Sequence, residues 1–332
     1  MGHRHPGIPL LACAMAFLTA LAAPAVAQIR MSLGWNPPTD EHPFAVAGNE
    51  FKKRVEQYTN GAIQVQTYCC FKMGSEEEMV KKLQLGTLDA TIVAQNNLGP
   101  YFRLYDVFTL PYILRDYDHA VKVLEGPVGK ALSEKSVKAT GFWIFSSASV
   151  AFRNVYNTKR PINSIKDVPG LRYRVPPNPV TIATYKAFGA DPTPLPWGET
   201  LTATQTGIVD GGDLEPTGFL LNKFADVAKN MAVTEHFALI APMLVSDRFM
   251  QKLTPDQRAA VQRAAIASCK VGQEAELKLE KTIYGTLEGM GVKLTHPDKA
   301  PFIQASQKVV DDIAAQRGGE FAELVTQIRN TR

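Results

Sequence analysis

The feature that most constrains the fold is a proline-free helical stretch that is too long for one small domain. It begins at Thr254-Pro255-Asp256-Gln257, where Thr and Gln form a capping box and the proline fits the first helical position. The next proline is Pro297, and the helical pattern continues to about Glu288. Such a helix is roughly 50 Å long at about 1.5 Å per residue. We therefore expect a helix that lies across two lobes and joins them.

A pattern of helix, glycine and strand occurs once in each half of the chain. In the first half, Ser75-Glu76-Glu77-Glu78 forms a capping box, and the helix that follows ends at Gly86. The segment 84–90 (QLGTLDA) is echoed by 205–211 (QTGIVDG). This repetition favours two similarly built α/β lobes.

Short runs rich in β-branched and aromatic residues predict strands that alternate with helices. Helical patterns include 44–58 and a segment that starts at Asn178-Pro179, an N-cap followed by proline. This alternation is typical of βα units and predicts an α/β fold with a largely parallel sheet. The predicted strands are 29–33, 63–68, 88–94, 142–147, 150–156, 172–175 and 237–245.

Residues 1–27 have the pattern of a secretory signal peptide. An uncharged run ends in Ala25-Val26-Ala27, an A-x-A cleavage site. A transmembrane helix fits less well, because Pro9 and Pro24 bracket an apolar core shorter than the roughly 20 residues that a bilayer needs. We expect export to the periplasm and a mature chain that starts at Gln28.

Size and charge limit the function classes. Removing 27 of the 332 residues leaves 305, which is long for a single core and favours two lobes. The formal charge of the whole chain is only +4, and no basic stretch is dense enough for nucleic acid.

The mature part keeps three cysteines, which are Cys69, Cys70 and Cys269. Adjacent cysteines bridge only through a strained peptide, so we expect Cys69 and Cys70 to be two unpaired thiols. No metal-ligand spacing accompanies them, and the sequence predicts no metal site.

Arg153 and Arg174 are the strongest candidates for ligand binding. A planar guanidinium holds a carboxylate by two parallel charge-assisted hydrogen bonds, so arginines on strands at a cleft make a rigid clamp. Arg174 lies in the segment 170–176 (GLRYRVP). Two other roles remain open here: an exposed strand arginine for Arg174, and a cross-strand ion pair for Arg153.

Catalytic motifs are missing from the sequence. It contains no G-x-S-x-G elbow, no H-E-x-x-H, no phosphate-binding glycine-rich loop and no C-x-x-C. The histidines of the mature part are scattered, and none has an obvious nucleophile beside it. We therefore expect a binding protein rather than an enzyme, with no cofactor.

The chain resembles the solute-binding proteins of tripartite ATP-independent periplasmic (TRAP) transporters, the DctP family. The matching segments follow the family's order over nearly the whole mature chain. They are 85–89 (LGTLD), 110–112 (LPY), 152–153 (FR), 170–176 (GLRYRVP), 189–194 (GADPTP), 205–211 (QTGIVDG) and 295–298 (THPD).

The resemblance implies a two-lobed fold of the periplasmic-binding-protein type, with a long helix spanning both lobes. Lobe I would comprise 28–150, with 238–278 returning to it. Lobe II would comprise 151–237, with 279–332 returning to it. The lobes would close over a carboxylate ligand.

The resemblance also implies roles for residues of lobe II. The family's main carboxylate-binding arginine corresponds to Arg174, a second arginine corresponds to Arg153, and an aromatic wall corresponds to Trp197. Relatives have a carboxamide where this chain has Leu214. From the residues alone, Trp197 equally suits the core at a helix start.

Further candidates come from both lobes. Asn36, Gln95 and Asn96 fall where relatives contact the rest of the ligand. Asn96 is also suited to shaping a turn. Asp213 and Glu215 suit a ligand hydroxyl or a cation, but two acids after a strand are more often solvated.

The function implied is a periplasmic binding subunit that delivers an organic acid to integral membrane subunits of a transporter. The alternative is a sensor that presents the acid to a receptor kinase. Leu214 offers no amide to a polar ligand, and Trp197 offers a flat apolar face. We therefore expect a monocarboxylate with an apolar, oxo or hydroxylated remainder rather than a sialic acid.

Overall fold

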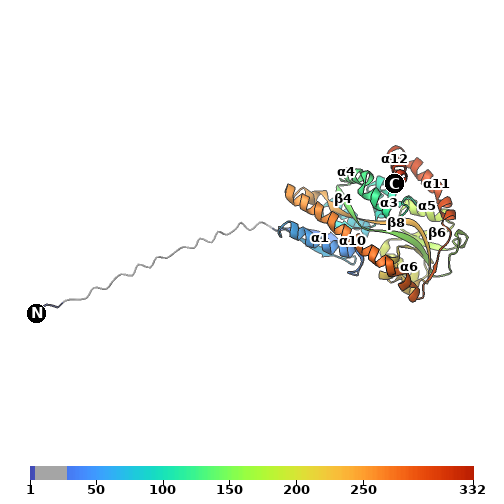
Figure 1. Ribbon diagram of the computed structural model, residues 1–332, viewed down its shortest axis with the longest axis horizontal. Coiled ribbons are helices and arrows are strands. Elements are labelled where there is room, and N and C mark those ends of the chain that lie inside the picture. Colours follow the sequence, from blue (N-terminus) through green and yellow to red (C-terminus); the bar gives the residue numbers. More distant parts are fainter. Residues whose placement is uncertain (4–27) are drawn as a thin grey trace.

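The computed structural model describes residues 1–3 and 28–332, and the predicted signal peptide lies outside the described residues apart from its first three. The described chain is an α/β protein with a central sheet and helices packed around it (Figure 1). Of the helices in this part of the chain, none combines the length and the apolar character that a membrane span needs.

Within the described residues, the strands form one mixed sheet. They are β1 (Ile29–Gly34), β2 (Ile63–Tyr68), β3 (Ala90–Ile92), β4 (Phe142–Asn157), β5 (Arg172–Val175), β6 (Asp191–Pro194), β7 (Gly211–Leu214), β8 (Asn230–Ser246) and β9 (Lys293–Thr295). The strand order is β2-β1-β3-β8-β4-β7-β5-β6, and β9 pairs with β8.

Two long antiparallel strands, β4 and β8, carry the chain between the lobes. Their pairing runs from Phe142 opposite Ser246 to Asn157 opposite Asn230. One end of β8 pairs with β3 in lobe I, and the other end pairs with β9. The sheet therefore continues from one lobe into the other through this pair.

The prediction of a largely parallel sheet is correct for the short strands of each lobe and wrong for most pairings of the long strands β4 and β8. β1 is parallel to β2 and β3, and β5 is parallel to β6 and β7. The crossing strands are antiparallel to each other, and β4 is also antiparallel to β7. The segments predicted as two strands, 142–147 and 150–156, form the single strand β4, with a register shift between Ser147 and Val150.

The helices begin and end largely where the capping signals predict. The capping boxes at Ser75 and Thr254 are both present, and Asn178 caps its helix by accepting from Val180 N–H. The α-helices are α1 (Pro43–Tyr58), α2 (Glu76–Leu85), α3 (Tyr117–Glu125), α4 (Pro127–Thr140), α5 (Pro179–Ala187), α6 (Thr200–Gln205), α7 (Pro216–Leu221), α8 (Phe224–Val227), α9 (Asp247–Met250), α10 (Pro255–Gly289), α11 (Ala300–Arg317) and α12 (Gly319–Asn330). Short 3₁₀ helices are η1 (Gln95–Asn97), η2 (Arg103–Thr109), η3 (Ile165–Asp167) and η4 (Trp197–Glu199).

The predicted long helix is α10, which has 35 residues. It packs against α1 of lobe I, against the crossing strand β4, and against α7 of lobe II. Figure 1 shows it extending along the molecule past α1 toward α6. Gly272 allows the close approach to β4, because a methyl group there would lie 2.4 Å from the Ala148 carbonyl oxygen.

The last two helices pack on both lobes. Phe302 of α11 belongs to the lobe II core with Phe188. Leu324 and Ile328 of α12, by contrast, pack in the lobe I core, and α12 contacts η2 and α4. We therefore propose that α12 belongs with lobe I, although the family resemblance implied that all of 279–332 returns to lobe II.

The expectation of two unpaired thiols is wrong, because Cys69 and Cys70 form a disulfide. The loop after β2 has left-handed backbone at Cys70 and Phe71, with φ values of 62° and 61°, and the two sulfur atoms meet in this turn. Cys269 is buried as a free thiol in α10.

Candidate ligand-binding site

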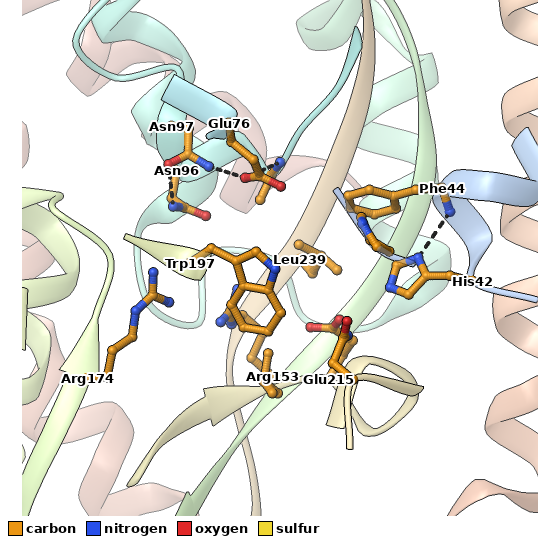
Figure 2. A pocket seen from close by; sticks show the side chains of 14 residues that line it. His42, Phe44, Glu76, Asn96, Asn97, Arg153, Arg174, Trp197, Glu215 and Leu239 are labelled. Carbon is orange, nitrogen blue, oxygen red and sulfur yellow. Dashed lines mark hydrogen bonds between the residues drawn. The ribbon is translucent and has the colours of Figure 1, made fainter. Parts of the chain in front are cut away.

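A cleft between the lobes is lined by side chains from both. Figure 2 shows these side chains converging on one space. Arg153, Arg174 and Leu214 lie on the strands β4, β5 and β7. The lining residues are Pro37, His42, Phe44, Glu76, Ala94, Asn96, Asn97, Arg153, Arg174, Trp197, Leu214, Glu215, Asn222 and Leu239.

Arg174 is a buried cation that has no acidic partner among the described residues. Its side chain lies on β5, and the residue is only 4% exposed. Nε donates to the Leu195 carbonyl oxygen at 2.9 Å, and the guanidinium lies 5.9 Å from the centre of the Trp197 ring. Burial and the neighbouring charge of Arg153 lower the pKa of Arg174 to about 10, so the group stays cationic at neutral pH.

Arg153 is also buried, but its charge is balanced. Its Nη2 donates to Asp213 Oδ1 at 2.8 Å and to the Asp213 carbonyl oxygen at 2.7 Å. The other Asp213 oxygen lies 3.2 Å from His236 Nε2. Burial opposes ionisation of this acid, but Arg153 and His236 hold the pKa of Asp213 well below its usual range. The ion pair that the sequence left as an alternative role for Arg153 is therefore present, with Asp213 as the partner. Arg153 lines the cleft as well.

Apolar side chains form the flat walls of the cleft. The Trp197 ring stacks on Phe224 at a centroid distance of 5.6 Å, so it lines the cleft and packs on the core at the same time. Leu214 is 3% exposed and lines the cleft from lobe II. Phe44 and Leu239 add apolar surface from lobe I.

The other predicted residues differ in whether they line the cleft. Asn96 lines the cleft, but Gln95 does not. The Gln95 amide donates to the Ala238 carbonyl oxygen at 2.6 Å and accepts from Ile240 N–H at 3.0 Å, so it ties η1 to β8. Asn36 is buried beside the cleft-lining Pro37, and its amide has no hydrogen-bond partner among the described residues.

Several further residues line the cleft, and most of them were not predicted as ligand contacts. For Glu215 the sequence left a ligand contact and a solvated position open, and the residue is 5% exposed and lines the cleft. Glu76 carries only the signal of an acid in the first turn of a helix, which is common for electrostatic reasons and says nothing about a cleft. His42 caps α1, and its Nδ1 accepts from Phe44 N–H at 3.3 Å. Asn222 was not predicted either, whereas Asn97 lies in the turn with Asn96 that the resemblance placed at the ligand.

The fold and the cleft define a class of protein: a two-lobed binding protein with a buried, unpaired cation between its lobes. The family DctP, described as "Bacterial extracellular solute-binding protein, family 7", matches residues 36–317. The chain belongs to this family of solute-binding proteins, and the predicted resemblance to TRAP binding proteins is confirmed. It is a family of substrate-binding proteins for transport rather than of catalysts.

Relatives match over nearly their whole length. A solute-binding protein from Verminephrobacter eiseniae is 31% identical over 304 residues, which cover 91% of this chain and 90% of the relative. The C4-dicarboxylate-binding periplasmic protein DctP of Rhodobacter capsulatus is 28% identical over 320 residues, covering 94% and 95% of the two chains.

Solved structures confirm the two-lobed fold. A TRAP periplasmic solute-binding protein from Polaromonas bound to D-erythronate has a TM-score of 0.87 and 28% identity, covering 92% of this chain and 99% of that one. One from Pseudomonas putida F1 with D-glucuronate has a TM-score of 0.86 and 27% identity, covering 92% and 98%.

Proposed function

We propose that this protein binds a small organic carboxylate in the inter-lobe cleft and delivers it to the integral membrane subunits of a TRAP transporter. The observation that carries the proposal is the Arg174 guanidinium, which lines the cleft, is buried, and has no ion-pair partner among the described residues. A buried charge without a partner is costly, and a ligand carboxylate removes that cost through paired hydrogen bonds.

The relatives support an acid as the ligand. The structures from Polaromonas and Pseudomonas hold D-erythronate and D-glucuronate, and the Rhodobacter relative is named for C4-dicarboxylates. The family assignment favours the transporter role over the sensor role. We propose export through cleavage of residues 1–27, which leaves the binding subunit in the periplasm.

The mechanism follows from the placement of the lining residues on both lobes. The ligand carboxylate meets Arg174 on lobe II, and closure brings lobe I groups such as Glu76 and Asn96 onto the rest of the ligand. A ligand that contacts both lobes stabilises the closed form by the contacts that it makes only there.

The test is a thermal-shift screen of the mature protein against organic acids, followed by calorimetry of the best ligand with Arg174 variants. We expect Arg174→Ala to lower the affinity at least ~30-fold, in keeping with the loss of one partner of a buried charge pair. Arg174→Lys should restore little, because an ammonium lacks the two-pronged donor geometry.

The matched control is Arg172→Lys. Arg172 lies on the same strand two residues earlier, but it is exposed and pairs with Asp210 at 2.8 Å. This variant should bind like the parent. If Arg174→Lys also bound like the parent, Arg174 would not be the carboxylate clamp.

A further inference from the structure

Two buried carboxyl groups line the same cleft, although holding a carboxylate does not require them. Glu76 and Glu215 are 6% and 5% exposed, and neither forms an ion pair within the described residues. Glu215 precedes the first residue of α7, its side chain makes no capping hydrogen bond, and its Oε2 has no hydrogen-bond partner among the described residues. Because a buried acceptor without a donor is costly, a ligand that brings donors is favoured here.

Glu76 is positioned by its neighbours in lobe I. Its Oε2 accepts from Ala94 N–H at 3.2 Å and from the Asn97 side-chain amide. No hydrogen bond of Oε1 is made within the described part of the protein. Figure 2 shows the Glu76 and Glu215 carboxyl groups on opposite sides of one space, beside Trp197. One ligand can therefore meet an acid of each lobe.

A donor to the ligand stands near these acceptors. His42 Nδ1 accepts from Phe44 N–H, so a neutral ring carries its proton on Nε2. Burial lowers the pKa of His42 to about 3, which keeps the ring neutral at physiological pH. The cleft thus combines carboxyl acceptors with an N–H donor, the set of groups that a hydroxyl satisfies, since a hydroxyl both donates and accepts.

A ligand ammonium fits this cleft less well than hydroxyl groups. Burial raises the pKa of Glu76 to about 7 and also raises that of Glu215, despite the positive charges of nearby arginines. A Glu76 carboxyl group that is partly protonated at neutral pH offers an ammonium less negative charge than an ionised one does. An ammonium would also share the cleft with the guanidinium groups of Arg153 and Arg174.

We propose that Glu76 and Glu215 read hydroxyl groups on the ligand, so that the cleft selects hydroxy acids over deoxygenated acids of the same carbon skeleton. This inference rests on the proposed function, because the carboxylate held by Arg174 fixes where the hydroxyl groups of the ligand lie in the cleft. Glu76 reads the ligand from lobe I and Glu215 reads it from lobe II.

The test is calorimetry with pairs of acids that differ only in their hydroxyl groups. The pairs are D-erythronate with butanoate and D-gluconate with hexanoate. The parent should bind the better hydroxy acid at least ~10-fold more tightly than its deoxygenated partner, in keeping with the loss of the hydrogen bonds that the hydroxyl groups make. Glu76→Gln and Glu215→Gln should each weaken the hydroxy acid ~10-fold or more and change the deoxygenated acid less than about twofold.

The control is Glu77→Gln, which changes the neighbouring acid of α2 that does not line the cleft. This variant should bind both acids of a pair like the parent, and thermal unfolding of all variants should confirm that they fold.

Three results would overturn the inference. Equal binding of both acids of a pair by the parent would reject the hydroxyl readout and leave the carboxylate clamp standing. An equal loss of both acids in the Gln variants would give the glutamates a structural role only. Preference for an α-amino acid such as L-alanine over the hydroxy acids would make the glutamates an ammonium site. Failure of every acid to bind would reject the proposed function itself.

Discussion

Arg153 and Arg174 lie in the same cleft, but their surroundings give them different roles. Asp213 balances Arg153 within the protein, at 2.8 Å. No acid among the described residues pairs with Arg174, whose Nε donates only to the neutral Leu195 carbonyl oxygen. Its charge is therefore available to a ligand carboxylate. Asp213 therefore acts indirectly: it does not line the cleft, and it confines the second arginine to one position.

The sequence predicted these two arginines and Trp197 as site residues, and the structure puts all three on the cleft. It did not separate Asn96, which lines the cleft, from Gln95, which bonds to β8. Adjacent residues in a 3₁₀ turn point in different directions, and the choice depends on a strand more than 140 residues away in the chain. Such long-range partners leave no local pattern.

The buried carboxyl group of Glu276 should make the stability of the folded protein depend on pH. It lies on α10 and accepts from Ser149 Oγ at 2.7 Å, next to the register shift of β4. Burial, together with the negative charge of Glu215, raises its pKa to about 7. The raised pKa means that the folded protein binds this proton more tightly than the unfolded chain does. Its stabilising contribution is thus present below the unfolded pKa of about 4.3 and is lost as the pH rises through about 7.

We expect Glu276→Gln to raise the free energy of unfolding at pH 8 by roughly 2–4 kcal/mol and to change it little at pH 4.5. The glutamine keeps an oxygen for Ser149 and never ionises. Urea denaturation at the two pH values measures the difference, and the exposed Glu274 on the same helix gives the control variant Glu274→Gln. An equal gain at both pH values would show that the Glu276 charge is not the cause.

At the scale of elements, the sequence predicted what local chemistry determines. The capped helices α2, α5 and α10 begin where their N-cap residues predict. The strands β6 and β9 were not predicted, because β6 has prolines at two of its four positions and β9 has only three residues. Short strands of this kind form through their partners, β5 and β8, rather than through their own pattern.

The loop that carries the disulfide reaches across the cleft. Phe71 of lobe I is 43% exposed and lies against Gly198 of η4 in lobe II, where an added methyl group would be 3.1 Å from its ring. Gly198 directly follows Trp197, so this contact lies at the edge of the ligand cleft. Because it joins the two lobes, it stabilises the closed arrangement and not the separate lobes.

We expect Phe71→Ala to weaken ligand binding by about 3- to 10-fold, the size of a modest apolar contact, while the melting temperature without ligand stays close to that of the parent. Calorimetry and thermal unfolding measure the two effects. The control is Ile266→Ala, which removes a similarly exposed apolar side chain, 48% exposed, from α10. Unchanged affinity in Phe71→Ala would show that the contact does not support closure.

At the scale of the whole molecule, β4, β8 and α10 run between the lobes in the described part of the chain. The register shifts of β4, between Ser147 and Val150 and between Arg153 and Val155, fall where the chain crosses. They interrupt regular pairing at the places where a hinge needs freedom.

Hydrogen bonds also join the lobes across the cleft. Asn178 Nδ2 donates to the Asn96 carbonyl oxygen and to Asp106 Oδ1, both at 3.1 Å.

The long helix and the two lobes were predictable because length and repetition are visible in a sequence. The position of α12 was not, because an amphipathic helix shows that it packs but not which core receives it. Its apolar face, with Leu324 and Ile328, enters the lobe I core.

Small-angle scattering of the mature protein tests the central claim most directly, that a carboxylate on Arg174 closes the lobes. The ligand is the best acid from the thermal-shift screen, measured with the parent and with Arg174→Ala at the same concentration. We predict that the radius of gyration of the parent falls at saturation, that far-ultraviolet circular dichroism stays the same, and that Arg174→Ala shows no contraction. An unchanged radius for the saturated parent, or an equal contraction of Arg174→Ala, would contradict the account.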